Sequence, residues 1–328
     1  GTADIFYDTT NTFDTVSATI RANNNILSAP SDGNQATFQN TLRFDGNTLI
    51  EATNGELSLA DSSLVVDDAE TTGARLTMNA ATDLDLRNSR LTVKGPTTLT
   101  SGGSANLAST ILNSSLSTTR DDITIDSNGA ITMTDARLTG SGAVNIDGES
   151  SITFGPSTVI NVNGDLGSQP LTISAAGNLD LGNADIDVRS LFNLDEDLLI
   201  ESTGGDIDLG TASLFYDATN TLDNVTTTIR AQGNLTSSPA NSGPNPFNNE
   251  IIVDGFTVFE AVAGNLELFD TDIDIRQAET TGSSLDLKAS QGDLSLGESR
   301  IKTSNNVAFL AGGNMDAGSS SVTVPNRI

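Results

Sequence analysis

Short glycine-led segments with alternating side chains recur along the chain. In each, the residues after the glycine alternate between apolar and polar types, as in 55–59 (GELSL), 129–133 (GAITM), 177–181 (GNLDL), 205–209 (GDIDL), 264–268 (GNLEL) and 292–296 (GDLSL). Alternation with a period of two places one set of side chains on one face of an extended strand. These segments are therefore predicted to be short β-strands with one buried face.

A second aliphatic residue follows the first apolar residue of such strands at an offset of seven. The pairs are Leu57/Leu64, Leu84/Leu91, Ile131/Leu138, Ile152/Val159, Leu179/Ile186, Ile207/Leu214, Leu266/Ile273, Leu294/Ile301 and Met315/Val322. In a straight strand an odd offset points the two side chains to opposite faces. A bend that shifts the phase by one residue restores a shared face, so the offset predicts a corner between two strands.

The residues around this corner share their size and polarity. Five positions after the reference there is a small residue, which suits the cramped inside of a bend: Ser62, Ser89, Ala136, Ser157, Ala184, Ala212, Thr271, Ser299 and Ser320. The polar residue one position earlier, as at Asp61, Asp135 and Asp270, is expected to lie outside the bend. Strand pairs joined by tight corners and repeated at intervals describe the coils of a β-solenoid.

The coil length follows from the reference residues, with Leu107 and Leu235 assigned by spacing alone. Nine intervals separate Leu57 from Leu294, which gives about 26 residues per coil, within the usual range for solenoid repeats. The predicted fold is all-β, a parallel β-helix of about 12–13 coils that residues 1–328 form as a single continuous solenoid. At the ~4.8 Å strand spacing such a rod would be roughly 60 Å long.

A longer sequence repeat spans several coils. Residues 6–30 recur at 215–239 with 15 identities in 25 positions, an offset of 209 in the numbering. The chain therefore holds copy one of a macro-repeat, 1–209, and a partial copy two, 210–328, which predicts a window on a longer repetitive chain. Segments 22–45 and 231–254 carry Pro30 in one copy and Pro239, Pro244 and Pro246 in the other, and we expect protruding loops there.

Composition excludes several classes of function. The chain has no His and no Cys, so an imidazole-assisted nucleophile and a zinc site of His or Cys ligands are both excluded. A net charge of −28 argues against nucleic acid as a partner, because affinity for phosphates comes from Lys and Arg. The longest apolar runs are a few residues, too short to span a membrane as a helix.

Acidic residues at the corners are candidate metal ligands. Asp61, Asp135 and Asp270 would line one edge of the solenoid, and Ca²⁺ prefers several carboxylate and carbonyl oxygens. The alternative is an edge solvated by water and screened by cations. No Asp-x-Asp-x-Asp-Gly loop or nonapeptide calcium repeat occurs, so no resident cofactor or metal is predicted, with Ca²⁺ as the exception to test.

Two further features invite a functional interpretation. Carboxylates gather at 67–68, 121–122 and 195–197, and a carboxylate pair is enough for glycoside hydrolysis. Trp is missing, however, and a sugar-cleaving site usually has stacking aromatic residues, so we predict that the protein is not an enzyme. Aromatic residues recur at equivalent places in the two copies: Phe6, Tyr7 and Phe38, and Phe215, Tyr216 and Phe247. They could form an exposed patch that binds a partner, but packing beneath the loops is the favoured interpretation.

The motif Gly-(Asp/Asn)-(Leu/Ile)-x-Leu, followed by a short turn and another aliphatic strand, resembles the repeats of filamentous haemagglutinin-like exoproteins. These large β-helical adhesins are exported by two-partner secretion. The resemblance implies a right-handed parallel β-helix, an outer-membrane secretion partner, and a place outside the cell or on the surface of a Gram-negative-type bacterium.

The predicted function is a non-catalytic, structural rod segment of a large secreted repetitive adhesin or biofilm-matrix protein. Its partners would be copies of itself or adjoining repeats of a longer chain, and surface polysaccharide. One alternative is a subunit of a self-assembling extracellular filament or sheath, since open solenoid ends expose strand edges. Another is a β-helical carbohydrate-active enzyme, a lyase or glycosidase.

Overall fold

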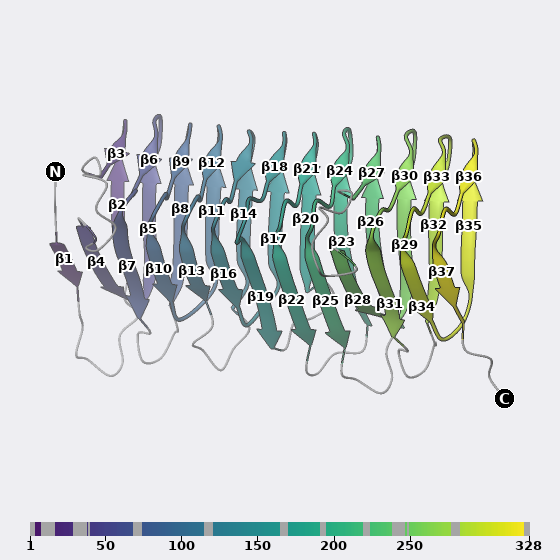
Figure 1. The fold of residues 1–328 in the computed structure, drawn as a ribbon. Coiled ribbons are helices and arrows are strands. Elements are labelled where there is room, and N and C mark those ends of the chain that lie inside the picture. Colours follow the sequence, from purple (N-terminus) through teal and green to yellow (C-terminus); the bar gives the residue numbers. More distant parts are fainter. Residues whose placement is uncertain are drawn as a thin grey trace. The chain divides into compact units, whose positions relative to one another are not determined.

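The computed structural model of the chain describes residues 4–7, 17–28, 38, 40–67, 74–114, 121–164, 170–190, 195–218, 224–237, 247, 249–276 and 283–324. Every regular element in these ranges is a β-strand, and none is a helix. The strands form three parallel sheets of 13, 12 and 12 strands (Figure 1). The predicted all-β class and parallel β-helix are therefore confirmed.

The chain divides into two compact units, residues 1–150 and 151–328. Sheet A consists of β1 (Asp4–Tyr7), β4 (Asn40–Asp45), β7 (Ser62–Asp67), β10 (Arg90–Val93), β13 (Ile111–Ser114) and β16 (Arg137–Gly140) in the first unit, and of β19 (Val159–Gly164), β22 (Asp185–Ser190), β25 (Ser213–Ala218), β28 (Asn249–Asp254), β31 (Thr271–Arg276), β34 (Arg300–Thr303) and β37 (Ser321–Thr323) in the second. Sheet B consists of β2 (Ser17–Ala22), β5 (Asn47–Ala52), β8 (Arg75–Ala80), β11 (Thr97–Ser101), β14 (Ile123–Ser127) and β17 (Val144–Gly148), and then of β20 (Leu171–Ala175), β23 (Asp195–Ser202), β26 (Asn224–Ala231), β29 (Phe256–Ala261), β32 (Ser284–Ala289) and β35 (Val307–Ala311). Sheet C consists of the two-residue strands β3 (Ile26–Leu27), β6 (Leu57–Ser58), β9 (Leu84–Asp85), β12 (Ala105–Asn106) and β15 (Ile131–Thr132), and then of β18 (Ile152–Thr153), β21 (Leu179–Asp180), β24 (Ile207–Asp208), β27 (Leu235–Thr236), β30 (Leu266–Glu267), β33 (Leu294–Ser295) and β36 (Met315–Asp316).

Each coil contributes one strand to sheet A, then one to sheet B, then one to sheet C. Within each unit, each strand pairs in parallel with the equivalent strand of the next coil, so that Leu57 faces Leu84 and Leu84 faces Ala105. The sheet C strands begin at Ile26 in the first coil and at Met315 in the last, and their spacing averages about 26 residues per coil. The predicted coil length is confirmed.

The core of each unit is a set of aliphatic columns that run from coil to coil. In sheet A of the first unit, Leu64, Leu91, Leu112 and Leu138 stack in register and are at most 2% exposed. Burial alternates with a period of two along the long strands, as the sequence predicts. Since a coil alone cannot enclose its inner side chains, its stability comes from the coils above and below it.

The corner between sheets C and A matches the seven-residue offset. Leu57 and Leu64 are both buried although an odd number of positions separates them. The chain changes direction through one residue in the left-handed region, with φ of 57° at Asp61 and 55° at Asn88 and Asp135. At Gly182 and Gly210, both at 54°, the left-handed residue lies one position earlier. This conformation suits Asp, Asn and Gly better than other residues.

Two predicted registers are wrong. Ala105, not Leu107, pairs with Leu84 and Ile131, because the small alanine occupies the first inward position of its strand. Ile160, not Val159, pairs with Ile186 and is fully buried. The turn before Ile160 is one residue longer than the others, which moves every later side chain of that coil by one position.

The predicted loops 22–45 and 231–254 are too wide. Strands β3 and β4 lie inside the first segment, and β27 and β28 lie inside the second. The alternating residues Leu42 and Phe44, and Ile251 and Val253, are at most 5% exposed, so they belong to the core columns of sheet A. The prolines of these segments lie outside the described residues.

The strands recur at the macro-repeat offset. Strands β2 to β8 of copy one correspond to β26 to β32 of copy two, and the pairings within the first group match those within the second. For example, Ile26 of β3 and Leu235 of β27 are equivalent by this offset, and each begins a sheet C strand.

Candidate functional site

Asn and Asp side chains connect successive coils at the corner between sheets B and C. Each Oδ1 accepts a hydrogen bond from the backbone N–H at the same position of the next coil. In the second unit, Asn178 accepts the N–H of Asp206 (3.1 Å), and Asp206 accepts that of Asn234 (2.7 Å). The series continues from Asn234 to Asn265 (2.9 Å), from Asn265 to Asp293 (2.9 Å) and from Asp293 to Asn314 (2.6 Å). In the first unit, Asn25 binds the N–H of Glu56 and Asp83 binds that of Ser104. We call this series the Asx ladder.

The Asx ladder explains why glycine leads the sequence motif. A Cβ built on Gly233 would lie under 3.0 Å from Oδ1 of Asp206, and one built on Gly103 would lie equally close to Oδ1 of Asp83. Neither glycine has a positive φ, so the requirement is space rather than backbone conformation. The Gly-Asx pair therefore encodes contact between coils, which the sequence analysis did not recognise.

Hydroxyl groups form a second connection inside the corner between sheets C and A. Ser299 Oγ donates to the carbonyl of Leu268 at 2.8 Å and accepts the N–H of Thr271 at 3.2 Å. Ser89 Oγ donates to the carbonyl of Leu59 at 2.5 Å. The small residue at this position is therefore selected for hydrogen bonding as well as for size, and Ala184 and Ala212 fill it without that bond.

The calcium candidates do not form a cluster. Asp61 and Asp135 lie in different coils of the first unit, and Asp270 lies in the second. Asp61 and Asp270 are only 7% and 9% exposed, which corrects the expectation that these residues lie outside the bend, whereas Asp135 is exposed. Among the described residues, no group of three or more acidic side chains is arranged to hold a metal ion.

The described carboxylates of the 67–68 and 121–122 clusters make structural contacts. Asp67 pairs with Arg43 (2.7 Å) and Lys94 (3.1 Å), and Asp122 Oδ1 accepts the N–H of Ala143 at 2.8 Å. Asp121 is fully buried. Asp68 and the side chains of residues 195 and 196 lie outside the described part of the chain.

The aromatic residues differ between the two copies. Tyr216 is fully buried, and Phe215 lies between the guanidinium groups of Arg189 (5.1 Å) and Arg276 (5.5 Å). In contrast, Phe6 is 65% exposed on the outermost strand of sheet A, and Phe38 is 42% exposed. The favoured packing interpretation thus holds for Tyr216 and is wrong for Phe6 and Phe38.

Two acidic residues stack in sheet C of the second unit. Asp180 and Asp208 pair in register on adjacent coils. Partial burial raises the pKa of Asp180, the N–H of Gly182 partly offsets this, and the charge of Asp208 raises the pKa further. Asp180 and Asp208 each accept the N–H of the glycine two residues later at 2.8 Å, which fixes the tight turn that follows.

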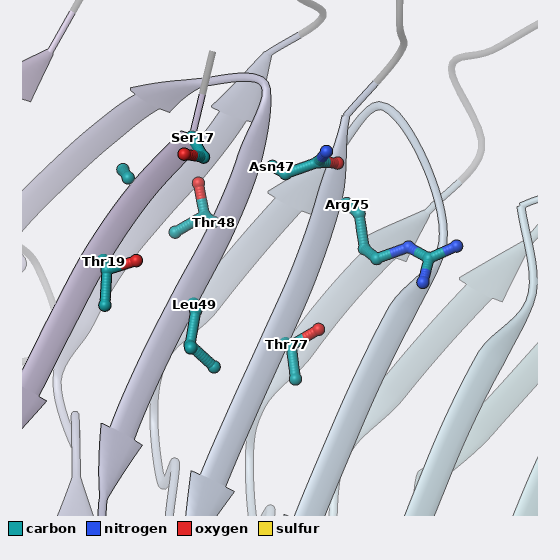
Figure 2. A pocket seen from close by; sticks show the side chains of 8 residues that line it. Ser17, Thr19, Asn47, Thr48, Leu49, Arg75 and Thr77 are labelled. Atoms are coloured by element: carbon teal, nitrogen blue, oxygen red, sulfur yellow. The ribbon is translucent and has the colours of Figure 1, made fainter. Parts of the chain in front are cut away.

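A hollow of about 300 Å³ lies on the outer face of sheet B in the first unit (Figure 2). Strands β2, β5 and β8 line it with Ser17, Ala18, Thr19, Asn47, Thr48, Leu49, Arg75 and Thr77. Figure 2 shows the Asn47 amide extending from β5 toward Arg75 on β8. The sequence gives no signal for this hollow, because its residues come from three coils and share no motif.

Comparison with known proteins identifies no relative. No protein-family model matches the chain, and neither a curated protein nor a solved structure is significantly similar to it. In the described part of the chain, no helix is long and apolar enough to cross a membrane.

Proposed function

We propose that the chain is a non-catalytic structural segment of a large secreted repetitive adhesin or biofilm-matrix protein. The observation that supports this most directly is the recurrence of whole groups of strands at the macro-repeat offset. An enzyme gains little from a second copy of its scaffold, whereas a protein that spaces or displays binding surfaces gains length with each copy.

The use of the acidic residues supports a structural role. Asp206 of the Asx ladder and Asp122 accept backbone N–H groups, and Asp67 pairs with basic side chains. Asp121 accepts the hydroxyl of Ser141. A carboxylate pair free to act as acid and base across a sugar would be needed for glycoside hydrolysis. We therefore place carbohydrate cleavage below adhesion, and we expect a place outside the cell with an outer-membrane secretion partner, as the family resemblance implies.

Self-assembly is the second candidate function, and the pairing between coils favours it. Equivalent strands of successive coils pair in parallel in all three sheets, and this pairing suits another coil of the same kind from an adjoining repeat or a second copy.

The test compares retention with cleavage. The purified chain is passed over surfaces coated with neutral or acidic bacterial polysaccharides, and the eluate is assayed for new reducing ends and unsaturated sugars. Retention without cleavage is the expected result. Release of sugar fragments would contradict the proposal and favour the enzyme, and absence of retention on every surface would contradict adhesion. Sedimentation and electron microscopy of the same sample measure assembly separately.

A further inference from the structure

We propose that the hollow on β2, β5 and β8 binds a carboxylated sugar, a hexuronate unit of an acidic polysaccharide. This inference rests on the proposed adhesive function and names the ligand class. A volume of about 300 Å³ is at the lower end for ligand sites in proteins, which suits one sugar unit rather than a large cofactor.

The outer residues of the hollow form two rows across three strands. Ser17, Asn47 and Arg75 are in register in the first row, and Thr19, Leu49 and Thr77 are in register in the second. At the usual strand spacing the rows span about 10 Å, and they lie about 7 Å apart along the strands. A pyranose ring fits this area, with its apolar face over Leu49 and its hydroxyl groups near the amide and hydroxyl side chains.

Arg75 supplies the charge that selects a carboxylate. Its side chain is exposed and makes no ion pair with any residue that the structure describes. The nearby Glu51 is occupied, because Arg21 Nε lies 2.5 Å from its Oε2. Arg75 therefore leaves a local positive charge on a chain of net charge −28, and a guanidinium binds a carboxylate through two parallel hydrogen bonds.

Copy two contains a natural comparison for this site. At the macro-repeat offset, Asn47, Arg75 and Thr77 are replaced by Phe256, Ser284 and Asp286. Asp286 forms an ion pair with Lys288 at 2.9 Å, and Phe256 is 39% exposed. The same strand framework therefore lacks the cation and the amide in copy two, and it carries an acid instead, so the predicted site belongs to copy one.

The experiment measures binding of tri-galacturonate to the full chain by titration calorimetry and ligand-observed NMR. The neutral galactose trisaccharide of the same linkage is the comparison ligand. Wild type is expected to bind the acidic trisaccharide, with affinity that falls at high salt. Arg75→Gln is expected to weaken binding about tenfold or more, the loss for a charge-assisted hydrogen-bond pair. Arg90→Gln is the matched control, since Arg90 is also exposed and makes no ion pair with a described residue.

Several outcomes would overturn the site. These are equal binding of the neutral trisaccharide, equal losses in the Arg75 and Arg90 variants, and no binding by wild type. Grafting Phe256→Asn, Ser284→Arg and Asp286→Thr into copy two should add a second site, and an unchanged stoichiometry would also count against the proposal. Retention on polysaccharide without tri-galacturonate binding would leave the adhesive function and remove this site, whereas the reverse result would keep the site and remove the adhesive function.

Discussion

The Asx ladder predicts that an alanine at Gly233 destabilises the chain only while Asp206 is present. Asp206 Oδ1 accepts the N–H of Asn234 at 2.7 Å and its Nδ2–H at 3.2 Å. A Cβ on Gly233 would displace this oxygen and break both bonds. Hydrogen bonds to charged groups contribute about 1.5–3 kcal/mol, and we take about 1–2 kcal/mol because Asp206 is exposed.

Replacing glycine by alanine also stabilises the folded chain, and this effect opposes the loss of the two hydrogen bonds. Gly→Ala stabilises a chain by about 0.4–1 kcal/mol through the entropy of the unfolded state, where the folded conformation allows it. Gly233→Ala should therefore cost about 0–1.6 kcal/mol net in the wild type. In Asp206→Ala the same change should be neutral or stabilising by up to about 1 kcal/mol, since the remaining Cβ contact to Gly205 O (3.1 Å) requires only a small shift.

The assay is a double-mutant cycle read by urea unfolding and by hydrogen exchange of the Asn234 amide. A coupling energy of about 1–2 kcal/mol and faster exchange at Asn234 in both single variants are expected. Gly129→Ala is the control, because its Cβ would meet the backbone of Gly103 (2.7 Å to O, 2.8 Å to C), which no side-chain change can relieve. An equal cost of Gly233→Ala with and without Asp206 would refute the explanation of the glycine.

Three further predictions test the core, the corner and the acidic pair. Leu266→Ala removes a fully buried side chain between coils and should cost about 2–5 kcal/mol in urea unfolding, and a cost below about 1 kcal/mol would show that the columns are not tightly packed. Ser299→Ala should cost about 1–2 kcal/mol by the same assay, because it leaves the Leu268 carbonyl without its hydroxyl donor. An unchanged free energy of unfolding would show that this hydrogen bond does not stabilise the corner. Asp208→Asn should lower the pKa of Asp180 in an NMR titration, since it removes a like charge. Because its pKa is raised, Asp180 stabilises the fold most below its unfolded pKa of about 3.9, and this contribution is lost as the pH rises through the folded pKa. Asp208→Asn should therefore make this loss of stability smaller. An unchanged titration of Asp180 would contradict the interaction between the two carboxylates.

Much of the coil geometry was available in the sequence. Side-chain alternation fixes which face of a strand is buried, and the odd offset from Leu57 to Leu64 requires a corner whatever the rest of the chain does. The average coil length tolerated a misassigned reference, because it depends only on the first and last references and the number of coils between them, and Leu107 is neither end. The register at Ala105 and Ile160 failed for a local reason: a small core residue and a one-residue insertion give no periodic signal.

The contacts between coils were decided only by the tertiary structure. Glycine, Asp and Asn stand side by side in the sequence, but the oxygen that requires the glycine comes from the coil before it, as Asp206 does for Gly233. The hollow at Arg75 likewise gathers residues from three successive coils that lie far apart along the chain. A sequence states the period of such a fold because each coil follows the same local rules. Contacts between coils depend on which residues the stacking brings into register, and this is a property of the folded chain.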